Sequence, residues 1–207
     1  MQAARFDEQI RRVWAAAKPR HRVEGMAWYS DAQGFARDLG ERYGVPEAVA
    51  AGVIAAISPN TYWEQNKRDA EKLIAAWKVS PAMAETVSIA SYGANKRKAL
   101  AILRSWAPDA YFDDQAGPKT WNFWMNLQGL DGVTVDRHAY SIAMGKRYTP
   151  ETMPSLTPAK YQAVADAYRR VAAQVGVEPR QLQAVTWIAW HDESLRRKLA
   201  SNGGVTN

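Results

Sequence analysis

The stretch that decides the fold runs Pro46-Glu-Ala-Val-Ala-Ala-Gly-Val-Ile-Ala-Ala-Ile57-Ser-Pro-Asn60. From Ala48 to Ile57 it is apolar without interruption, over ten residues. A helix that crosses a bilayer needs about 20 such residues, so this run is typical of a helix buried in a protein core. Proline is tolerated in a first helical turn, and Pro59 disfavours a helical conformation in the residue before it. The stretch therefore predicts a core helix over 46–57 that breaks at Ser58-Pro59-Asn60.

Helical periodicity continues on both sides of this stretch. Apolar residues recur every three to four positions, and no alternation of valine, isoleucine and threonine extends beyond about four residues. Ser30 and Asp31 are candidate caps for a second helix, which Gly44 would end. Together these patterns predict an all-α fold of about ten helices. Besides 46–57, helices are expected over roughly 4–17, 31–43, 61–78, 95–106, 119–128, 137–144, 157–175 and 178–190.

The composition narrows the kinds of site that the chain can hold. Its 207 residues include 27 lysines and arginines, 21 aspartates and glutamates and no cysteine, which gives a net charge of +6. The lack of cysteine excludes disulfides, thiolate nucleophiles and iron–sulfur clusters, and three scattered histidines disfavour a zinc site. We therefore expect no metal and no cofactor. The positive charge suits a polyanionic partner without identifying one.

The N-terminal residues favour a cytoplasmic protein. Charged residues follow Met1 almost at once, without the apolar core of a secretory signal. Because no apolar run is long enough to span a bilayer, we expect no membrane partner.

Four segments carry the polar residues that chemistry would need. They are Ser58-Pro-Asn-Thr-Tyr-Trp-Glu-Gln-Asn-Lys67, Gly93-Ala-Asn-Lys-Arg-Lys-Ala-Leu100, Gly117-Pro-Lys-Thr-Trp-Asn-Phe-Trp124 and Val133-Thr-Val-Asp-Arg-His-Ala139. In this order they resemble motifs of the helix-hairpin-helix superfamily of DNA base-excision glycosylases. In that superfamily the third segment is a hairpin whose lysine is the nucleophile of bifunctional members, and the fourth carries the catalytic aspartate. The corresponding residues are Lys119 and Asp136, which are 17 positions apart.

The resemblance implies a helix-hairpin-helix DNA glycosylase-like fold, with two helical lobes flanking a cleft. Residues 1–192 would form this single domain, with 45–130 as a central lobe and 1–44 together with 131–192 as the second lobe. Residues 193–207 are expected to fray, because they are charged and then rich in glycine and asparagine. The expected partner is double-stranded DNA with a flipped, modified pyrimidine.

Asp136 is the residue for which the local sequence gives the clearest role. An aspartate before a helical run usually caps the helix by accepting hydrogen bonds from its free N–H groups. The helix dipole and these amides also keep the carboxylate ionised. An ionised carboxylate at a cleft can stabilise a cationic sugar or accept a proton from an incoming nucleophile. Capping and catalysis are therefore compatible at this position.

Lys119 has two possible roles. As a nucleophile it would need a pKa depressed by burial, and as a cation it could bind a phosphate instead. The other candidate DNA- or substrate-binding residues are aromatic side chains that could stack on a base, amides that could contact its edge, a histidine, and cations that could contact phosphate. They are Asn60, Trp63, Asn66, Lys67, Lys96, Lys98, Trp121, Asn122, Arg137 and His138.

The hairpin departs from the usual pattern of the superfamily. That pattern reads Leu-Pro-Gly-x-Gly, whereas this chain reads Gln115-Ala-Gly-Pro-Lys119, with a single glycine and a proline that lacks an N–H. This degenerate hairpin, the Ser-Pro-Asn-x-x-Trp-x-x-Asn and Gly-Pro-Lys-Thr-Trp-Asn-Phe signatures, and the closing Gln181-Leu-Gln-Ala-Val-Thr-Trp-Ile-Ala-Trp190 are similar to a bacteriophage branch. Its members, implicated in thymidine hypermodification, are amino acid:DNA transferases.

The resemblance to this branch implies a substitution on a DNA base. A free amino acid, with glycine expected, would displace pyrophosphate from 5-(pyrophosphoryloxymethyl)uracil. Asp136 would accept the proton of the amine, and Lys119, Arg137 and a lysine of the 96–98 group would neutralise the pyrophosphate. Two alternatives remain open: a DNA glycosylase, with or without AP-lyase activity, that excises a modified or damaged base, and a DNA-binding protein without catalysis.

Overall fold

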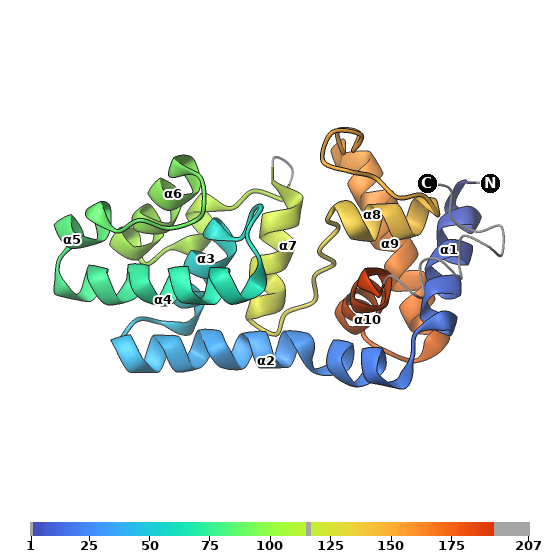
Figure 1. Ribbon diagram of the computed structural model, residues 1–207, viewed down its shortest axis with the longest axis horizontal. Helices are drawn as coiled ribbons and strands as arrows, with labels where there is room; N and C mark the ends of the chain where they lie inside the picture. Colours follow the sequence, from blue (N-terminus) through green and yellow to red (C-terminus); the bar gives the residue numbers. More distant parts are fainter. Residues whose placement is uncertain (1, 115–116, 193–207) are drawn as a thin grey trace. The chain divides into compact units, whose positions relative to one another are not determined.

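The computed structural model describes residues 2–114 and 117–192, and the regular elements of that part of the chain are all helical (Figure 1). The described residues form ten α-helices and one short 3-10 helix, without a strand. Their bounds are α1 Gln2–Ala16, α2 Pro19–Tyr43, α3 Glu47–Ile57, α4 Trp63–Val79, α5 Pro81–Thr86, α6 Gly93–Ser105, η1 Pro108–Tyr111, α7 Pro118–Leu127, α8 Arg137–Met144, α9 Pro158–Val175 and α10 Pro179–His191. The prediction of an all-α fold with about ten helices is confirmed for these residues.

Two expectations fall outside the described residues. One concerns Gln115 and Ala116, at the start of the degenerate hairpin. The other is the frayed tail expected over 193–207.

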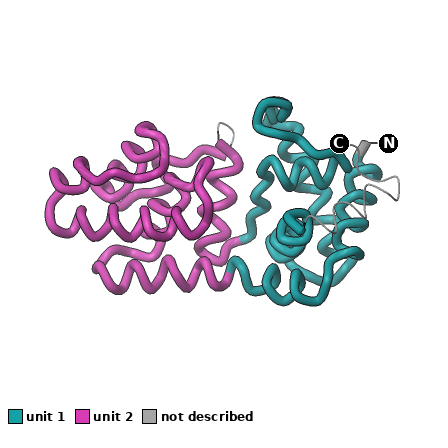
Figure 2. Tube along the Cα trace, in the orientation of Figure 1, with its two compact units in different colours: residues 1–29, 131–207 teal, residues 30–130 magenta. Residues whose placement is uncertain are grey.

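The chain divides into two compact units (Figure 2). Unit 1 combines Met1–Tyr29 with Asp131–Asn207, and unit 2 is Ser30–Leu130. Unit 1 is therefore built from two stretches that are far apart in the sequence, and α2 contributes residues to both units.

Unit 2 is organised around α3. All nine residues from Val49 to Ile57 are buried, and α3 contacts α4, α6 and α7. The helix begins one residue after Pro46 and ends at Ser58, after which Asn60 adopts a left-handed φ of 59°. The predicted core helix and its break are thus confirmed. No described helix, α3 included, has both the length and the apolar composition needed to cross a bilayer.

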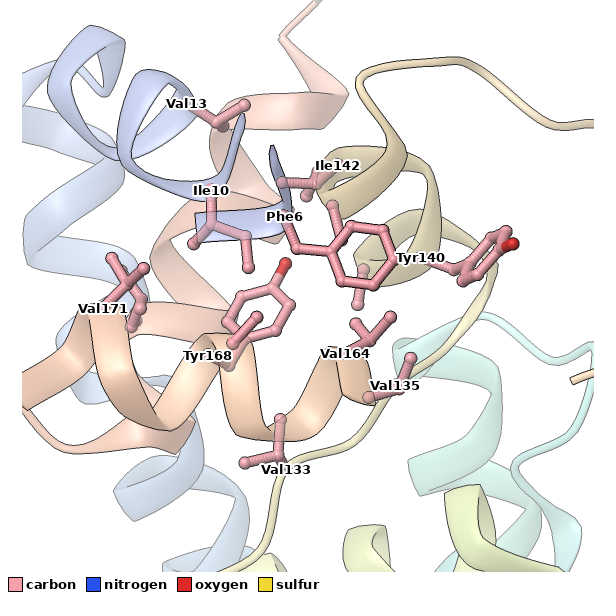
Figure 3. Close-up of a cluster of buried hydrophobic side chains, with 14 of the residues drawn as sticks. Phe6, Ile10, Val13, Val133, Val135, Tyr140, Ile142, Val164, Tyr168 and Val171 are labelled. Carbon is pink, nitrogen blue, oxygen red and sulfur yellow. The ribbon is translucent and has the colours of Figure 1, made fainter. Parts of the chain in front are cut away.

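Unit 1 buries side chains from α1, α8, α9 and α10 in one hydrophobic cluster (Figure 3). On α1, Phe6, Ile10 and Val13 are buried in this cluster, while Trp14 packs at its margin. Tyr168 of α9 is fully buried. Each such side chain contributes about 1.5–3 kcal/mol by leaving water, so the cluster holds α8 and α10, which carry the site described below, in fixed places.

The start of α2 differs from the sequence prediction. Ser30 and Asp31 do not cap this helix but lie inside it, because it begins at Pro19. Proline is favourable at a first helical position, and no further proline interrupts 19–43. Buried contacts with α10 fix the added part, since the Tyr29 hydroxyl donates to Gln183 Oε1 at 2.8 Å. The predicted end before Gly44 is confirmed, and that glycine has a left-handed φ of 61°.

Two short helices were not predicted, namely α5 and η1. Both begin at a proline. At α5 the Ser80 hydroxyl caps the helix by accepting a hydrogen bond from the Met83 N–H at 3.0 Å. Short helices of this kind lack the length over which hydrophobic periodicity becomes visible.

Gly25 of α2 lies against the backbone of Val185 in α10, and this contact generates a prediction. A Cβ at Gly25 would lie 2.5 Å from the backbone Cα of Val185, so Gly25→Ala forces the two helices apart. We expect the free energy of unfolding to fall by about 1–3 kcal/mol. Gly34→Ala, in the same helix, meets only the end of the Arg37 side chain at 3.8 Å. There the higher helix propensity of alanine should stabilise the protein by up to about 1 kcal/mol.

Urea denaturation followed by circular dichroism measures both variants. Equal effects of the two substitutions would contradict the close helix contact.

Candidate functional site

The carboxylate of Asp136 is held by two N–H groups. Its Oδ1 accepts a hydrogen bond from the Ala139 backbone N–H at 2.7 Å, and its Oδ2 accepts one from the indole N–H of Trp187 at 3.0 Å. The first bond caps α8, as the sequence predicts. The second ties α8 to α10. The Asp136 residue is half-buried, so its carboxylate is neither sealed in the core nor free to rotate in solvent.

A buried tyrosine positions the segment that leads to Asp136. The Tyr161 hydroxyl donates to the Val133 carbonyl at 2.7 Å and accepts from the Val135 N–H at 3.0 Å. Burial raises the pKa of this phenol well above its usual value of 10, so it remains a hydroxyl that can make both bonds. The segment stays extended although it pairs with no neighbouring strand, and Asp136 enters α8 from a fixed direction.

The rings of two histidines and a tryptophan lie in tilted contact beside the carboxylate. The ring centroids of Trp187 and His191 are 3.9 Å apart, and those of His191 and His138 are 4.3 Å apart. Because a carbonyl only accepts, His191 Nδ1–H donates to the Trp187 carbonyl at 2.7 Å. The spacing of Trp187 and His191, four residues apart on α10, places both rings on one face of the helix.

His138 is neutral at physiological pH. The pKa of His138 is lowered from 6.5 to about 4, chiefly by burial; Asp136 opposes this shift, while His191, Arg137 and Arg147 contribute to it. The geometry agrees, since the Arg137 guanidinium, which can only donate, lies 3.3 Å from His138 Nε2. Nε2 therefore accepts and Nδ1 carries the proton. None of the described residues accepts a hydrogen bond from that Nδ1–H.

Of the residues predicted for the site, Asp136, Arg137 and His138 lie together in unit 1. Lys119 lies in unit 2, exposed in the first turn of α7, as the sequence places it. Since Lys119 and Asp136 belong to different units, the site described here is built from unit 1 alone.

The amides and aromatic residues predicted in unit 2 make contacts within that unit. Asn60 donates to the Tyr92 hydroxyl at 3.0 Å, and Asn122 donates to the Pro118 carbonyl at 2.8 Å. Trp63 packs edge-on against Phe35 and Phe123, as Trp121 does against Trp124.

Asn66 requires a correction, because its side chain does not reach the surface. It is only 1% exposed, and its Nδ2 donates to the Ile54 carbonyl at 3.2 Å. It faces α3 because it lies on the buried side of α4, together with Ala70 and Leu73. Asn66 therefore holds α4 against α3, and its expected contact with a base is not compatible with this burial.

Besides Lys119, three predicted lysines of unit 2 make contacts within that unit. Lys96 Nζ donates to the carbonyls of Glu85 and Val87, so it fixes the chain after α5. Lys67 pairs with Glu64 at 2.9 Å, and Lys98 lies over the ring of Phe112 at 5.6 Å. The expected phosphate contact of Lys96 would require it to leave two carbonyl acceptors.

The residues predicted for the site do not include Trp187, His191 and Tyr161. The i, i+4 spacing of Trp187 and His191 was visible, but the sequence does not tell which element α10 faces. Tyr161 gave no signal, because a tyrosine on the buried face of an amphipathic helix is typical of core packing. No group of three possible metal ligands occurs in the part of the chain that the structure describes.

Comparison with known proteins places the chain in one family. A model described as a family of unknown function (DUF7178) matches residues 1–194, so the chain belongs to that family. Neither curated proteins nor solved structures gave a match.

The neutral state of His138 predicts how stability depends on pH. Its folded pKa, about 4, lies below the 6.5 expected in an unfolded chain, so protonation favours unfolding. The neutral His138 ring contributes to the free energy of unfolding. We expect this contribution to be fully present above pH 6.5, to fall as the pH drops toward 4, and to be lost below that. Chemical denaturation of the wild type and of His138→Asn across this range measures the effect.

NMR titration of the His138 ring provides a second measurement. Arg137→Gln should raise its pKa and Asp136→Asn should lower it further, because these charges act in opposite directions. A His138 ring that titrates near 6.5 would contradict the described environment.

Proposed function

We propose that this member of the DUF7178 family is a DNA-modifying enzyme that transfers an amino acid to 5-(pyrophosphoryloxymethyl)uracil in DNA and releases pyrophosphate. Glycine is the expected donor. The sequence resemblance to phage amino acid:DNA transferases, on a helix-hairpin-helix glycosylase-like fold, supplies the reaction. The observation that carries the proposal is the Asp136 carboxylate, oriented by two N–H donors beside a neutral imidazole.

The proposed reaction needs a proton acceptor more than a nucleophile from the protein. The amine nitrogen forms a bond to the exocyclic methylene carbon of the base. The carbon–oxygen bond breaks, and its electron pair leaves with pyrophosphate. The nitrogen becomes strongly acidic as its new bond forms, so that even a weak base takes the proton. A carboxylate has about four lone-pair positions, so Asp136 can accept this proton while it keeps both N–H contacts.

His138 supports the same assignment through its charge state. A protonated imidazole next to Asp136 would form an ion pair with the carboxylate and weaken it as a base. The neutral ring avoids this competition, and its Nδ1–H is a donor suited to a carbonyl oxygen of a pyrimidine. Trp187 adds a half-buried aromatic ring next to the carboxylate. Aromatic surfaces of this kind stack on bases that have left the duplex.

Base excision is the second candidate, and the same carboxylate favours it. An ionised aspartate at a helix N-terminus can stabilise the cationic sugar that forms when a glycosidic bond breaks. The two functions differ in their products. Transfer gives a thymidine analogue that carries the amino acid on its exocyclic carbon through a carbon–nitrogen bond, and excision gives an abasic site.

The assay that tests the proposal combines the protein, DNA containing 5-(pyrophosphoryloxymethyl)uracil and glycine. We expect mass spectrometry of the digested nucleosides to show a glycine adduct. Asp136→Asn should lower the rate by about 100-fold or more, because it removes the proton acceptor. Asp131→Asn, which removes an exposed carboxylate of the same unit, is the matched control and should leave the rate unchanged.

Abasic sites without an adduct would assign the chain to base excision. A rate of transfer that Asp136→Asn leaves intact would remove this carboxylate from the mechanism.

A further inference from the structure

Arg137 is a half-buried cation for which the described part of the chain provides no ion-pair partner. Among the described residues its guanidinium donates to two uncharged acceptors, the Tyr148 carbonyl at 2.9 Å and His138 Nε2 at 3.3 Å, and to no carboxylate. Arg170, in the same unit, shows the usual alternative, since it pairs with Asp7 at 2.7 Å. A guanidinium removed in part from water gains from a bound anion, and no described residue forms an ion pair with Arg137.

A closed set of hydrogen bonds fixes this guanidinium. After α8 the chain turns at Gly145, whose φ is 62°, and runs back beside the helix. The Tyr148 N–H then donates to the Ser141 hydroxyl at 3.2 Å, and that hydroxyl donates to the Arg137 carbonyl at 2.6 Å. The Tyr148 carbonyl in turn accepts a hydrogen bond from the Arg137 guanidinium. Backbone and side chain of Arg137 are both held, so little conformational entropy remains to be lost when a ligand binds.

Two more cations follow on the same turn. Lys146 is exposed, with its Nζ 5.5 Å from the centre of the Tyr148 ring. Arg147 is exposed and lies close enough to His138 to lower its pKa. Neither forms an ion pair with a described residue. The carboxylates in this neighbourhood are Asp136, already bound by two N–H groups, and Glu151, which is exposed and near Arg137.

We propose that Arg137, Lys146 and Arg147, here called the 137–147 cation cluster, bind the pyrophosphate group of the substrate. The identity of this ligand rests on the proposed function. A pyrophosphate concentrates several negative charges on adjacent phosphorus centres, whereas each phosphate of a DNA backbone carries one, so three neighbouring cations match it better. The 137–147 cation cluster would then neutralise the negative charge of the leaving pyrophosphate, while Asp136 accepts the proton of the amine.

Isothermal titration calorimetry with inorganic pyrophosphate tests the cluster on the intact protein, without catalysis. We expect binding that Arg137→Gln and Arg147→Gln each weaken by about tenfold or more, the loss typical of one charge-assisted contact. Because Arg147 is exposed, its substitution should leave the fold of the site intact. Arg5→Gln, an exposed arginine of α1 in the same unit, is the control and should bind as the wild type does.

Titrations with inorganic phosphate and with unmodified duplex DNA distinguish a pyrophosphate site from a contact with the phosphates of the DNA backbone. Weaker binding of phosphate than of pyrophosphate supports the proposal. If the variants weaken the binding of plain DNA but leave pyrophosphate binding unchanged, the cluster contacts the DNA backbone and the proposal is overturned. Absence of pyrophosphate binding, or binding that neither variant changes, overturns it as well.

The His138 ring reports the same event by NMR. Asp136, Arg137, Arg147 and His191 already act on this ring, and an added polyanion beside the arginines should raise its pKa. A ring whose titration is unchanged at saturating pyrophosphate would place the anion elsewhere and overturn the proposal. If pyrophosphate binds as expected but no amino acid is transferred to DNA, the proposed function fails while the anion site stands.

Discussion

The structure of unit 1 around the site depends on one carboxylate that accepts two hydrogen bonds. Asp136 caps α8 through Ala139 and reaches α10 through the indole of Trp187. A cap contributes about 1 kcal/mol, and a bond to a charged acceptor about 1.5–3 kcal/mol. Both bonds require the ionised carboxylate, or an acceptor of the same shape. The group that we propose as the base is thus also the group that keeps two helices in register.

The negative and positive groups at the start of α8 point to different partners. The carboxylate stands at the start of α8, and the guanidinium of Arg137 is directed to the Tyr148 carbonyl on the returning chain. His138 is a neighbour of both groups and is uncharged because it is partly removed from water. The carboxylate and the guanidinium also use separate partners, since Asp136 accepts from two N–H groups and Arg137 donates to the Tyr148 carbonyl and to His138. Such a separation suits a reaction in which a proton and an anionic leaving group depart in different directions.

The hydrophobic cluster of unit 1 and the polar site share the same elements. Tyr161 belongs to the cluster through its ring, while its hydroxyl satisfies the buried backbone of the 133–135 segment. Leaving those backbone groups without partners would cost about 1–3 kcal/mol each. Core packing therefore determines where Asp136 stands, and the close approach of Gly25 to Val185 adds a second constraint on α10. Precise placement of the carboxylate is a product of this packing.

The sequence by itself determined most helix ends and the capping role of Asp136. These are local properties, since a proline, a left-handed glycine or a capping carboxylate acts within one turn of the chain. Local signals failed at α2, where Ser30 resembles a cap but contacts made further along the chain continue the helix through it. Only the tertiary structure decided that Trp187, 51 residues beyond Asp136, supplies the second hydrogen bond, and that Asn66 is buried. The reason is physical: hydrophobic burial is not directional, so periodicity tells which face of a helix is covered but not which helix covers it.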